Sequence, residues 1–440
     1  MADHHLDTAR EVLSANDRGR FTVPAAGQYP HQWNWDSALI ALGWATIDPD
    51  RAWTELEALA GAQDPDSQLI AHIAFTPGAE GYEPGPASWR PDGVPAIRGV
   101  DGREISQISQ PPVAATCLRL LHERHPRPDR LPAVVEALHA WHRFWMTVRD
   151  PARSGEPVII HPWESGRDNA AEFASALAAV PRIVKSPARA DREHVDARER
   201  PTDRDYEGYL SLVELGRRVR FDQAALAATG PLRVSDPAMI AILGRACEDL
   251  AALADGIDTR WAAEERVWAQ RLRTALIGRL DPRTAIPACV DHAAGRATRL
   301  VGCAAPLCLL TSGLPGWAVD RLCAMVEPGG PLHSPFGVRS LAPGEPGHDP
   351  RRYWLGPAWA NITWLCALGA AGHRRDGTAA GLMSAVRRFF EHAGPVEYVH
   401  PDSGEPSGAR GFAWTAALYL DVTGRTSPRR RSAGRSSHGH

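Results

Sequence analysis

Apolar residues recur at helical spacing over most of this 440-residue chain. Long alternating runs of β-branched residues, which are typical of strands, are almost absent. We therefore predict an all-α protein with a few short strands at most. Helices are expected at residues 5–16, 36–46, 51–61, 111–124, 131–147, 205–220, 236–254, 258–279, 316–327, 357–371, 377–393 and 412–422.

A chain with this many helices favours a two-layered helical ring over a four-helix bundle. No sequence repeat of about 20–50 residues is evident, which disfavours a solenoid. Residues 1–424 are predicted to form a single domain, and the polar, Arg- and Ser-rich residues 425–440 a disordered tail. Two long irregular segments, 75–109 and 181–204, are expected to form lids over a central pocket, because loops of this length in a compact domain are usually functional.

Charge and composition exclude several classes of protein. A formal net charge of −3 offers no attraction for nucleic acid or a membrane surface. No apolar run of about 18 residues predicts a membrane-spanning helix, and the first residues lack the apolar region of a signal peptide. The 7 Cys show no zinc-ligand spacing and are expected to be reduced packing residues of a cytoplasmic protein. Formation of a homo-oligomer stays open.

Several segments place aromatic and polar residues together just before a predicted helix. In "QYPHQWNWDSALIALG" (28–43), Trp33 and Trp35 could form a stacking wall for a sugar, with Asp36 accepting sugar hydroxyls. The alternative is that Asp36 caps the helix while the Trp residues belong to the core. In "QISQPPVAATCLRLL" (107–121), Gln110 either points its amide into a cavity or marks a plain helix start.

The segment "HPWESGRDNAAEF" (161–173) carries two carboxylates four residues apart, Glu164 and Asp168. Pro and Gly make it a poor helix, so a tight loop is favoured over a solvated helix face. Such a loop would place a carboxyl group beside Trp163. An apolar ring next to a carboxyl group raises its pKa by desolvation, as a general acid requires.

Two later segments supply further candidate site residues. "RRYWLGPAWANITWL" (351–365) offers aromatic residues that either line a cavity or pack in the core. "GPVEYVHPDSGEPSGARGFAWTAALYL" (394–420) offers Glu397 and Glu405, followed by Trp414. If the helix starts converge at one mouth of a ring, Asp168 would face one of these glutamates across a Trp-lined cavity. An acid and a base so placed are what hydrolysis of a glycosidic bond requires.

The motifs "WNWDSA", "SQPP", "HPWESGRDN", "YWLGPAWANITW" and "EYVHPDSGE…GFAWTAA" resemble family 63 of the glycoside hydrolases, and most of all its bacterial mannosylglycerate and glucosylglycerate hydrolases. The likeness runs in order over nearly the whole chain. It implies an (α/α)6 barrel and an inverting mechanism with Asp168 as general acid. It implies Glu397 as general base, because Tyr398 follows it as a Tyr follows the family's base.

The resemblance also implies which residues bind the substrate. Residues that hold the sugar are expected to be Trp35, Asp36 and Gln110, with an aromatic lining from Tyr353, Trp354 and Trp359. Residues at the glycerate end are expected to be Tyr29, Trp33, Arg200 and Tyr206, with Tyr82 on the 75–109 segment. An Arg fork suits a substrate carboxylate. Further substrate contacts are predicted for Trp163, Glu164 and Trp414.

The sequence departs from the family pattern at Ala170, Ala171 and Glu172, where relatives carry small polar and Pro residues, and at Leu355, where relatives often carry Arg. These changes are expected to touch the sugar subsite. We predict an inverting α-glycosidase acting on glucosylglycerate or mannosylglycerate.

Three alternatives stay open: a trehalase or oligosaccharide α-glucosidase, a catalytically silent carbohydrate-binding protein, and a different activity on the same ring, such as a sugar epimerase or polysaccharide lyase. The epimerases and lyases usually need His or Tyr bases, so the pair of Asp168 and Glu397 argues against them. Because no HExxH motif and no Gly-rich phosphate loop occurs, we expect neither a metal nor another cofactor.

Overall fold

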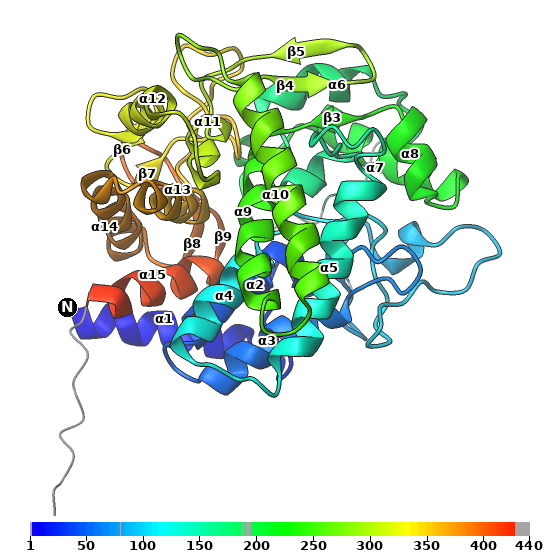
Figure 1. The fold of residues 1–440 in the computed structure, drawn as a ribbon, viewed down its shortest axis with the longest axis horizontal. Coiled ribbons are helices and arrows are strands. Elements are labelled where there is room, and N and C mark those ends of the chain that lie inside the picture. The colour runs from blue at the N-terminus through cyan, green and yellow to red at the C-terminus, as the bar shows by residue number, and fades with distance from the viewer. Residues whose placement is uncertain (1, 80, 186–188, 190–194, 427–440) are drawn as a thin grey trace, which may run out of the picture.

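The computed structural model describes residues 2–79, 81–185, 189 and 195–426, and helices dominate it (Figure 1). The helices are α1 (Ala2–Asn16), α2 (Asn34–Trp44), α3 (Pro49–Gly61), α4 (Ala114–Arg124), α5 (Leu131–Thr147), α6 (Ala174–Ala179), α7 (Asp203–Arg218), α8 (Gln223–Thr229), α9 (Pro237–Ala254), α10 (Thr259–Arg279), α11 (Ala304–Leu307), α12 (Gly316–Val326), α13 (Ala360–Gly372), α14 (Asp376–Ala393) and α15 (Ala413–Thr426).

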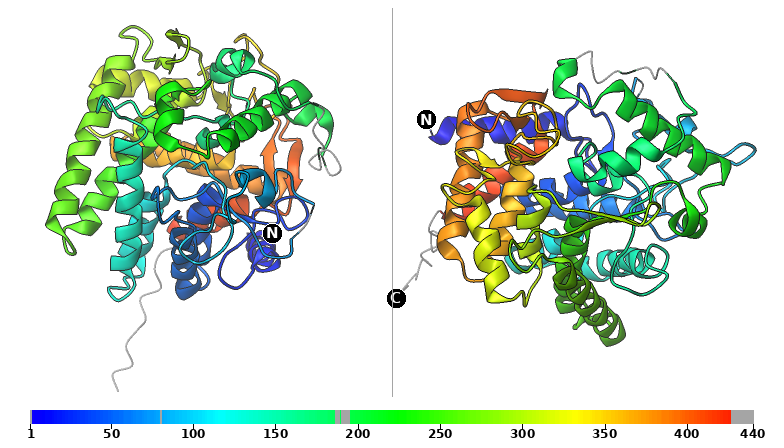
Figure 2. Two further views of the ribbon diagram at one scale, coloured as in Figure 1. Left: turned by 90° about the vertical axis from the view of Figure 1, so that its right-hand side faces the viewer. Right: turned by 90° about the horizontal axis from the view of Figure 1, so that it is seen from above.

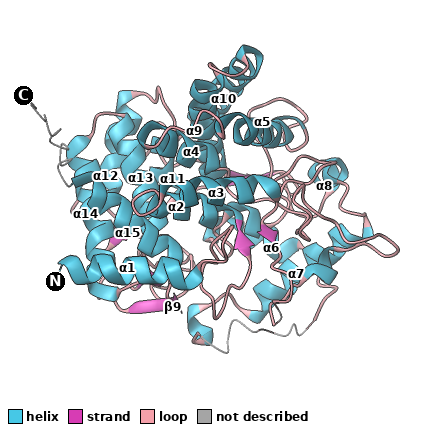
Figure 3. Cartoon of the chain, turned by 90° about the horizontal axis from the view of Figure 1, so that it is seen from below, coloured by secondary structure: helices cyan, strands magenta, loops and turns pink. Residues whose placement is uncertain are grey.

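The strands of the described residues are short and pair antiparallel in four small sheets, which are scattered among the helices (Figure 3). They are β1 (Gln32–Trp33) with β2 (Ile73–Ala74); β3 (Val234–Ser235), β4 (Cys289–Asp291) and β5 (Arg296–Thr298); β6 (His333–Ser334) with β7 (Gly337–Val338); and β8 (Val396–Val399) with β9 (Pro406–Arg410).

Six helices form a closed inner ring, because each packs against the next: α2 contacts α4, α4 contacts α9, α9 contacts α11, α11 contacts α13, α13 contacts α15, and α15 returns to α2. The outer helices α1, α3, α5, α10, α12 and α14 each pack against a member of this ring. The first and last helices thus lie side by side, with α1 packed against α15 (Figures 1 and 2). This is the predicted (α/α)6 barrel.

Burial explains which helices are inner and which are outer. Every residue of α2 is buried, and so is α13 from its first residue to Ala370, because apolar side chains make up most of the surface of both helices. The outer helices α3 and α14 bury a single stripe, which is what amphipathic periodicity produces. Side-chain packing in the inner ring therefore builds the core.

All twelve helices expected from periodicity are present, with boundaries shifted by a few residues. The shifts have local causes: α4 begins only at Ala114, because the preceding Pro-Pro pair stays outside the helix. The short α6, α8 and α11 were not predicted, since four to seven residues carry no readable period.

Residues 425–440 were predicted to be a tail, but α15 extends to Thr426. The rest of that prediction, residues 427–440, lies outside the described residues. All seven cysteines are buried free thiols, in line with their predicted packing role. In the described chain, no helix has the length and apolar character to cross a membrane.

The ring depends on close contact between α2 and α15, which a glycine substitution tests. A Cβ built on Gly43 would lie 2.5 Å from the Cα of Ala417, so we predict that Gly43→Ala destabilises the protein by about 1–3 kcal/mol. The matched control is Gly278→Ala in α10, where a Cβ would meet nothing within 4 Å. That variant should gain up to about 1 kcal/mol from better helix propensity. Chemical unfolding measures both, and an equal effect on each would contradict this packing.

Candidate active site

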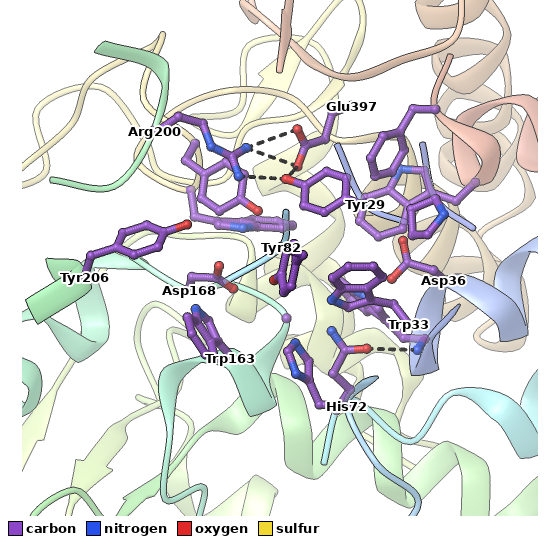
Figure 4. A pocket seen from close by; sticks show the side chains of 18 residues that line it. Tyr29, Trp33, Asp36, His72, Tyr82, Trp163, Asp168, Arg200, Tyr206 and Glu397 are labelled. Carbon is purple, nitrogen blue, oxygen red and sulfur yellow. Dashed lines mark hydrogen bonds and ion pairs between the residues drawn. The ribbon is translucent and has the colours of Figure 1, made fainter. Parts of the chain in front are cut away.

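A cavity opens where loops before the inner helices converge (Figure 4). Fourteen of the sixteen predicted site residues line it: Tyr29, Trp33, Trp35, Asp36, Tyr82, Gln110, Trp163, Asp168, Arg200, Tyr206, Tyr353, Trp354, Glu397 and Trp414. Segments that lie up to several hundred residues apart in the sequence thus meet at one mouth of the ring. Glu164 and Trp359 are the two predicted residues that do not line the cavity.

Asp168 follows the tight turn that its sequence predicted. A 3-10 helix, η2 (Pro162–Ser165), ends at Gly166, whose φ of 65° favours glycine. A Cβ on Gly166 would also lie 2.6 Å from the Trp35 ring, so only glycine lets this ring approach. The turn carries Trp163 and Asp168 into the cavity wall.

The pKa of Asp168 is raised from 3.8 to about 7. Desolvation by the surrounding protein is the main cause, and the charge of Glu397 adds to it. The Arg200 guanidinium acts in the opposite direction and limits the rise. A carboxyl group with this pKa is largely protonated below neutral pH and can donate its proton, as a general acid must.

Glu164 does not point into the cavity, contrary to our prediction of a substrate contact. It is fully buried, where its Oε1 and Oε2 accept hydrogen bonds from Arg149 at 2.7 and 2.9 Å. The same oxygens accept the backbone N–H of Ser109 at 3.0 Å and of Ile160 at 2.8 Å. Glu164 therefore fixes the loop of Asp168 against the segment that carries Gln110.

The loop is held at its other end as well. Arg167, next to Asp168, is buried and donates to Asp236 Oδ1 at 2.8 Å at the start of α9. Asn169 Oδ1 accepts the backbone N–H of Trp354 at 3.0 Å. Two buried ion pairs before Asp168 and the hydrogen bond of Asn169 after it therefore limit the movement of its backbone.

Glu397 lies on β8, at an irregularity in its pairing with β9 between Val396 and Tyr398. Such irregularities re-aim side chains. The carboxylate is buried, and its Oε2 accepts the backbone N–H of Ala409 at 2.9 Å. Glu405, the other candidate, is half-exposed, pairs with Arg351 at 2.8 Å and does not line the cavity.

Arg200 faces Glu397 from the second irregular segment (Figure 4). Its Nη1 donates to Glu397 Oε2 at 3.2 Å, and its Nη2 donates to the Tyr29 hydroxyl at 2.6 Å. The Tyr29 hydroxyl in turn donates to Glu397 Oε1 at 3.1 Å. The guanidinium packs over the ring of Tyr353, 4.4 Å from its centroid.

The wall opposite Arg200 includes the start of α2, where Trp35 and Asp36 line the cavity together with Gln110. Gln110 Oε1 accepts the backbone N–H of Trp35 at 3.2 Å, which fixes the amide at this position. Asp36 lies in the first turn of α2 and is not its cap, because the N-cap residue is Trp33. Burial, followed by the charge of Glu397, raises the pKa of Asp36.

Aromatic rings form the rest of the wall. Trp33 meets Tyr29 and Tyr82 edge-on, with centroids 5.3 and 5.1 Å away. Trp359 was predicted to line the cavity, but it stacks behind Trp354 at 3.8 Å and is fully buried. Trp359 supports the lining without being part of it, because Trp354 covers it.

Four lining residues were not predicted: Pro24, His72, Gly166 and Phe412. His72 stacks on Trp163 with an interplanar angle of 13°, and burial, aided by His161, lowers its pKa. In the sequence, His72 stands in the apolar run "LIAHIAF" and resembles a core histidine. Phe412 could have been predicted as a lining residue, since it stands two residues before Trp414, a predicted substrate contact.

Both irregular segments reach the cavity, one through Tyr82 and the other through Arg200. Residues 186–188 and 190–194 of the second predicted lid lie outside the described residues. The departures from the family pattern lie elsewhere than expected: Ala170, Ala171, Glu172 and Leu355 line a neighbouring groove and not the cavity. Asp168 borders both spaces.

One group of described side chains could hold a metal ion, namely His142, Cys247 and Glu265. None of them lines the cavity. Glu265 Oε2 lies 2.9 Å from His142 Nδ1, and Oε1 lies 2.8 Å from His139 Nδ1, so the buried carboxylate has partners within the protein. The predicted absence of a metal or cofactor in the chemistry stays a prediction.

Residues 29–415 match the family model of the mannosylglycerate hydrolase MGH1-like glycoside hydrolase domain. The chain belongs to this family. It is 38% identical to a mannosylglycerate hydrolase of Thermus thermophilus, over 94% of this glycoside hydrolase and 99% of the relative. It is 34% identical to a glucosylglycerate hydrolase of Mycolicibacterium hassiacum, over 94% and 97% of the two chains.

A solved structure supports the same fold. A GH63 mannosylglycerate hydrolase from Thermus thermophilus, in complex with Tris and D-glycerate, matches with a TM-score of 0.88 and 37% identity. The match covers 95% of this glycoside hydrolase and 100% of that chain. The predictions of the family and of its (α/α)6 fold are confirmed.

The raised pKa of Asp168 also affects stability. In the folded protein Asp168 stays protonated up to about pH 7, whereas in the unfolded chain it loses its proton near pH 3.8. The wild type therefore loses stability as the pH rises between these two values. Asn does not titrate. We predict that Asp168→Asn melts above the wild type at about pH 8, and that the gap narrows toward about pH 5. Thermal melts test this, with Glu405→Gln as the control; a gap independent of pH would contradict it.

Proposed function

We propose that this enzyme hydrolyses the α-glycosidic bond of glucosylglycerate or mannosylglycerate with inversion at the anomeric carbon. One observation carries the proposal: a buried arginine, Arg200, shares an aromatic cavity with a carboxyl group of pKa about 7, Asp168, and a second carboxylate, Glu397. Acid, base and a cation for the carboxylate of glycerate are what the reaction requires. The relatives named above support this choice of substrate.

In the proposed reaction, Asp168 donates its proton to the glycosidic oxygen as the bond to the anomeric carbon breaks. Glu397 takes a proton from a water molecule, whose oxygen attacks that carbon from the opposite face. The products are the free sugar as its β-anomer and glycerate. Asp168 ends ionised and Glu397 protonated, so one proton must return from Glu397 to Asp168 through solvent before the next cycle.

The proposed binding roles follow the geometry of the wall. Asp36, Gln110 and Trp35 would hold the sugar, since they lie together at the start of α2. Arg200, with Tyr29 and Tyr206, would hold the glycerate carboxylate. Tyr82 and Arg200 narrow the cavity from the two irregular segments, which favours a small substrate over the oligosaccharides of the alternative hypothesis.

We further propose that residues 1–424 act as one catalytic unit, because the helical ring closes between α15 and α2. We propose the cytoplasm as its compartment, since seven buried thiols without disulfides suit a reducing environment. Assembly into a homo-oligomer stays an open prediction.

Turnover of a substrate panel tests the proposal. We expect release of glycerate from α-glucosylglycerate or α-mannosylglycerate, with kcat/KM for the better of the two at least about 100-fold above that for trehalose. Coupled detection of free sugar gives the rates. Preferred hydrolysis of trehalose would contradict the proposed substrate, and sugar binding without any turnover would favour a silent carbohydrate-binding protein.

Two matched amide substitutions test which glutamate is the base. We predict that Glu397→Gln lowers kcat by about 10²–10⁴-fold, because the amide cannot accept a proton from water. Glu405→Gln removes the same charge from a half-exposed residue outside the cavity and should leave kcat within about twofold. Steady-state kinetics on the preferred glycoside decide between them. The assignment would be wrong if Glu405→Gln were the inactive variant.

A further inference from the structure

The acceptor positions of Glu397 are all occupied in this structure. Oε1 accepts from the Tyr29 hydroxyl at 3.1 Å and from Arg200 Nη1 at 3.4 Å. Oε2 accepts from the backbone N–H of Ala409 at 2.9 Å and from Arg200 Nη1 at 3.2 Å. A carboxylate offers about four lone-pair positions. A general base must accept a proton from water, so at least one of these contacts has to be released before reaction.

Arg200 is the contact best suited to release. The Ala409 N–H belongs to the backbone of β9 and stays where the hairpin holds it. Arg200 supplies both of the longer contacts, and its Nη2 also holds the Tyr29 hydroxyl at 2.6 Å. Movement of one guanidinium would therefore remove a hydrogen bond from each oxygen of Glu397.

The backbone next to Arg200 is anchored to the same hairpin. The carbonyl of Glu199 accepts the Tyr398 hydroxyl at 2.5 Å, and Glu199 Oε2 accepts the backbone N–H of Gly408 at 3.0 Å. Release of Glu397 would thus be a side-chain movement of Arg200. Its guanidinium lies over the Tyr353 ring, which can support the cation in more than one orientation.

A buried guanidinium that leaves one carboxylate is stabilised when another carboxylate takes its place. Arg200 is 2% exposed, and an unpaired charge at such a site is strongly unfavourable. A carboxylate that enters the cavity on the aglycone of a substrate provides that partner, in the two-pronged geometry that arginine prefers. A hydroxyl group on the aglycone does not.

We infer that Arg200 is a specificity switch: it caps Glu397 in the free enzyme, and a carboxylate on the aglycone frees Glu397 by taking over the guanidinium. The inference rests on the proposed function. An uncharged glycoside would then bind with its sugar in place but turn over slowly, because Glu397 stays capped. Discrimination against uncharged aglycones should therefore appear in kcat more than in KM.

A matched pair of substrates and one variant test the switch. α-Glucosylglycerol carries a CH2OH group where α-glucosylglycerate carries the carboxylate, and the mannosyl pair serves if mannose is preferred. For the wild type we expect kcat to be at least about 100-fold lower on the glycerol compound. Arg200→Gln should raise kcat on the glycerol compound by about tenfold while lowering kcat/KM on the glycerate compound by about 10²-fold or more. An equal loss on both compounds would overturn the switch.

A second measurement needs no variant, so it stands even if Arg200→Gln does not fold. The wild type is given the α-glycosyl fluoride of the preferred sugar, which leaves the aglycone end of the cavity empty. Added D-glycerate should raise kcat on the fluoride several-fold, whereas glycerol should not. Inhibition alone by D-glycerate would overturn the inference.

The outcomes separate the two proposals. Absence of any hydrolysis of glycerate glycosides by the wild type would refute the proposed function. Normal hydrolysis of these glycosides, with no gain on the uncharged substrates in either experiment, would refute only the switch.

Discussion

The proposed mechanism needs a protonated and an ionised carboxyl group in one largely buried cavity, and much of the structure serves this constraint. Burial raises the pKa of Asp168 to about 7, which keeps its proton available near neutral pH. Glu397 is buried as well, and the buried guanidinium of Arg200 forms an ion pair with it. Arg200 also limits the rise at Asp168, so one cation affects both groups.

The helical ring makes such an arrangement stable. Inner helices such as α2 and α13, which are buried over nearly their whole length, build the core, and the loops at their starts carry polar residues to one mouth. Long loops would be mobile without further support, because few apolar contacts hold them. Two buried ion pairs, Arg149 with Glu164 and Arg167 with Asp236, hold the loop just before Asp168. Removal of one partner from such a pair leaves a buried charge and typically costs about 3–5 kcal/mol.

Local patterns in the sequence predicted the helices and the turn at Gly166, because periodicity and glycine geometry act within a few residues. The assignment of Glu397 and Arg200 came from family resemblance, since nothing local separates Glu397 from Glu405. Glu164 was misjudged for a related reason. It stands four residues from Asp168 and looks equivalent in sequence, but its partner Arg149 lies on another segment. His72 was missed because it lines the cavity by stacking on Trp163, which lies about ninety residues further along the chain.

The stereochemistry of the first product tests the central claim most directly, because only water attack opposite the leaving group inverts the anomeric carbon. Proton NMR of the wild type with α-glucosylglycerate and with α-mannosylglycerate follows the anomers before they mutarotate. We predict that the β-anomer of the free sugar appears first. Initial release of the α-anomer would contradict inversion and, with it, the roles given to Asp168 and Glu397.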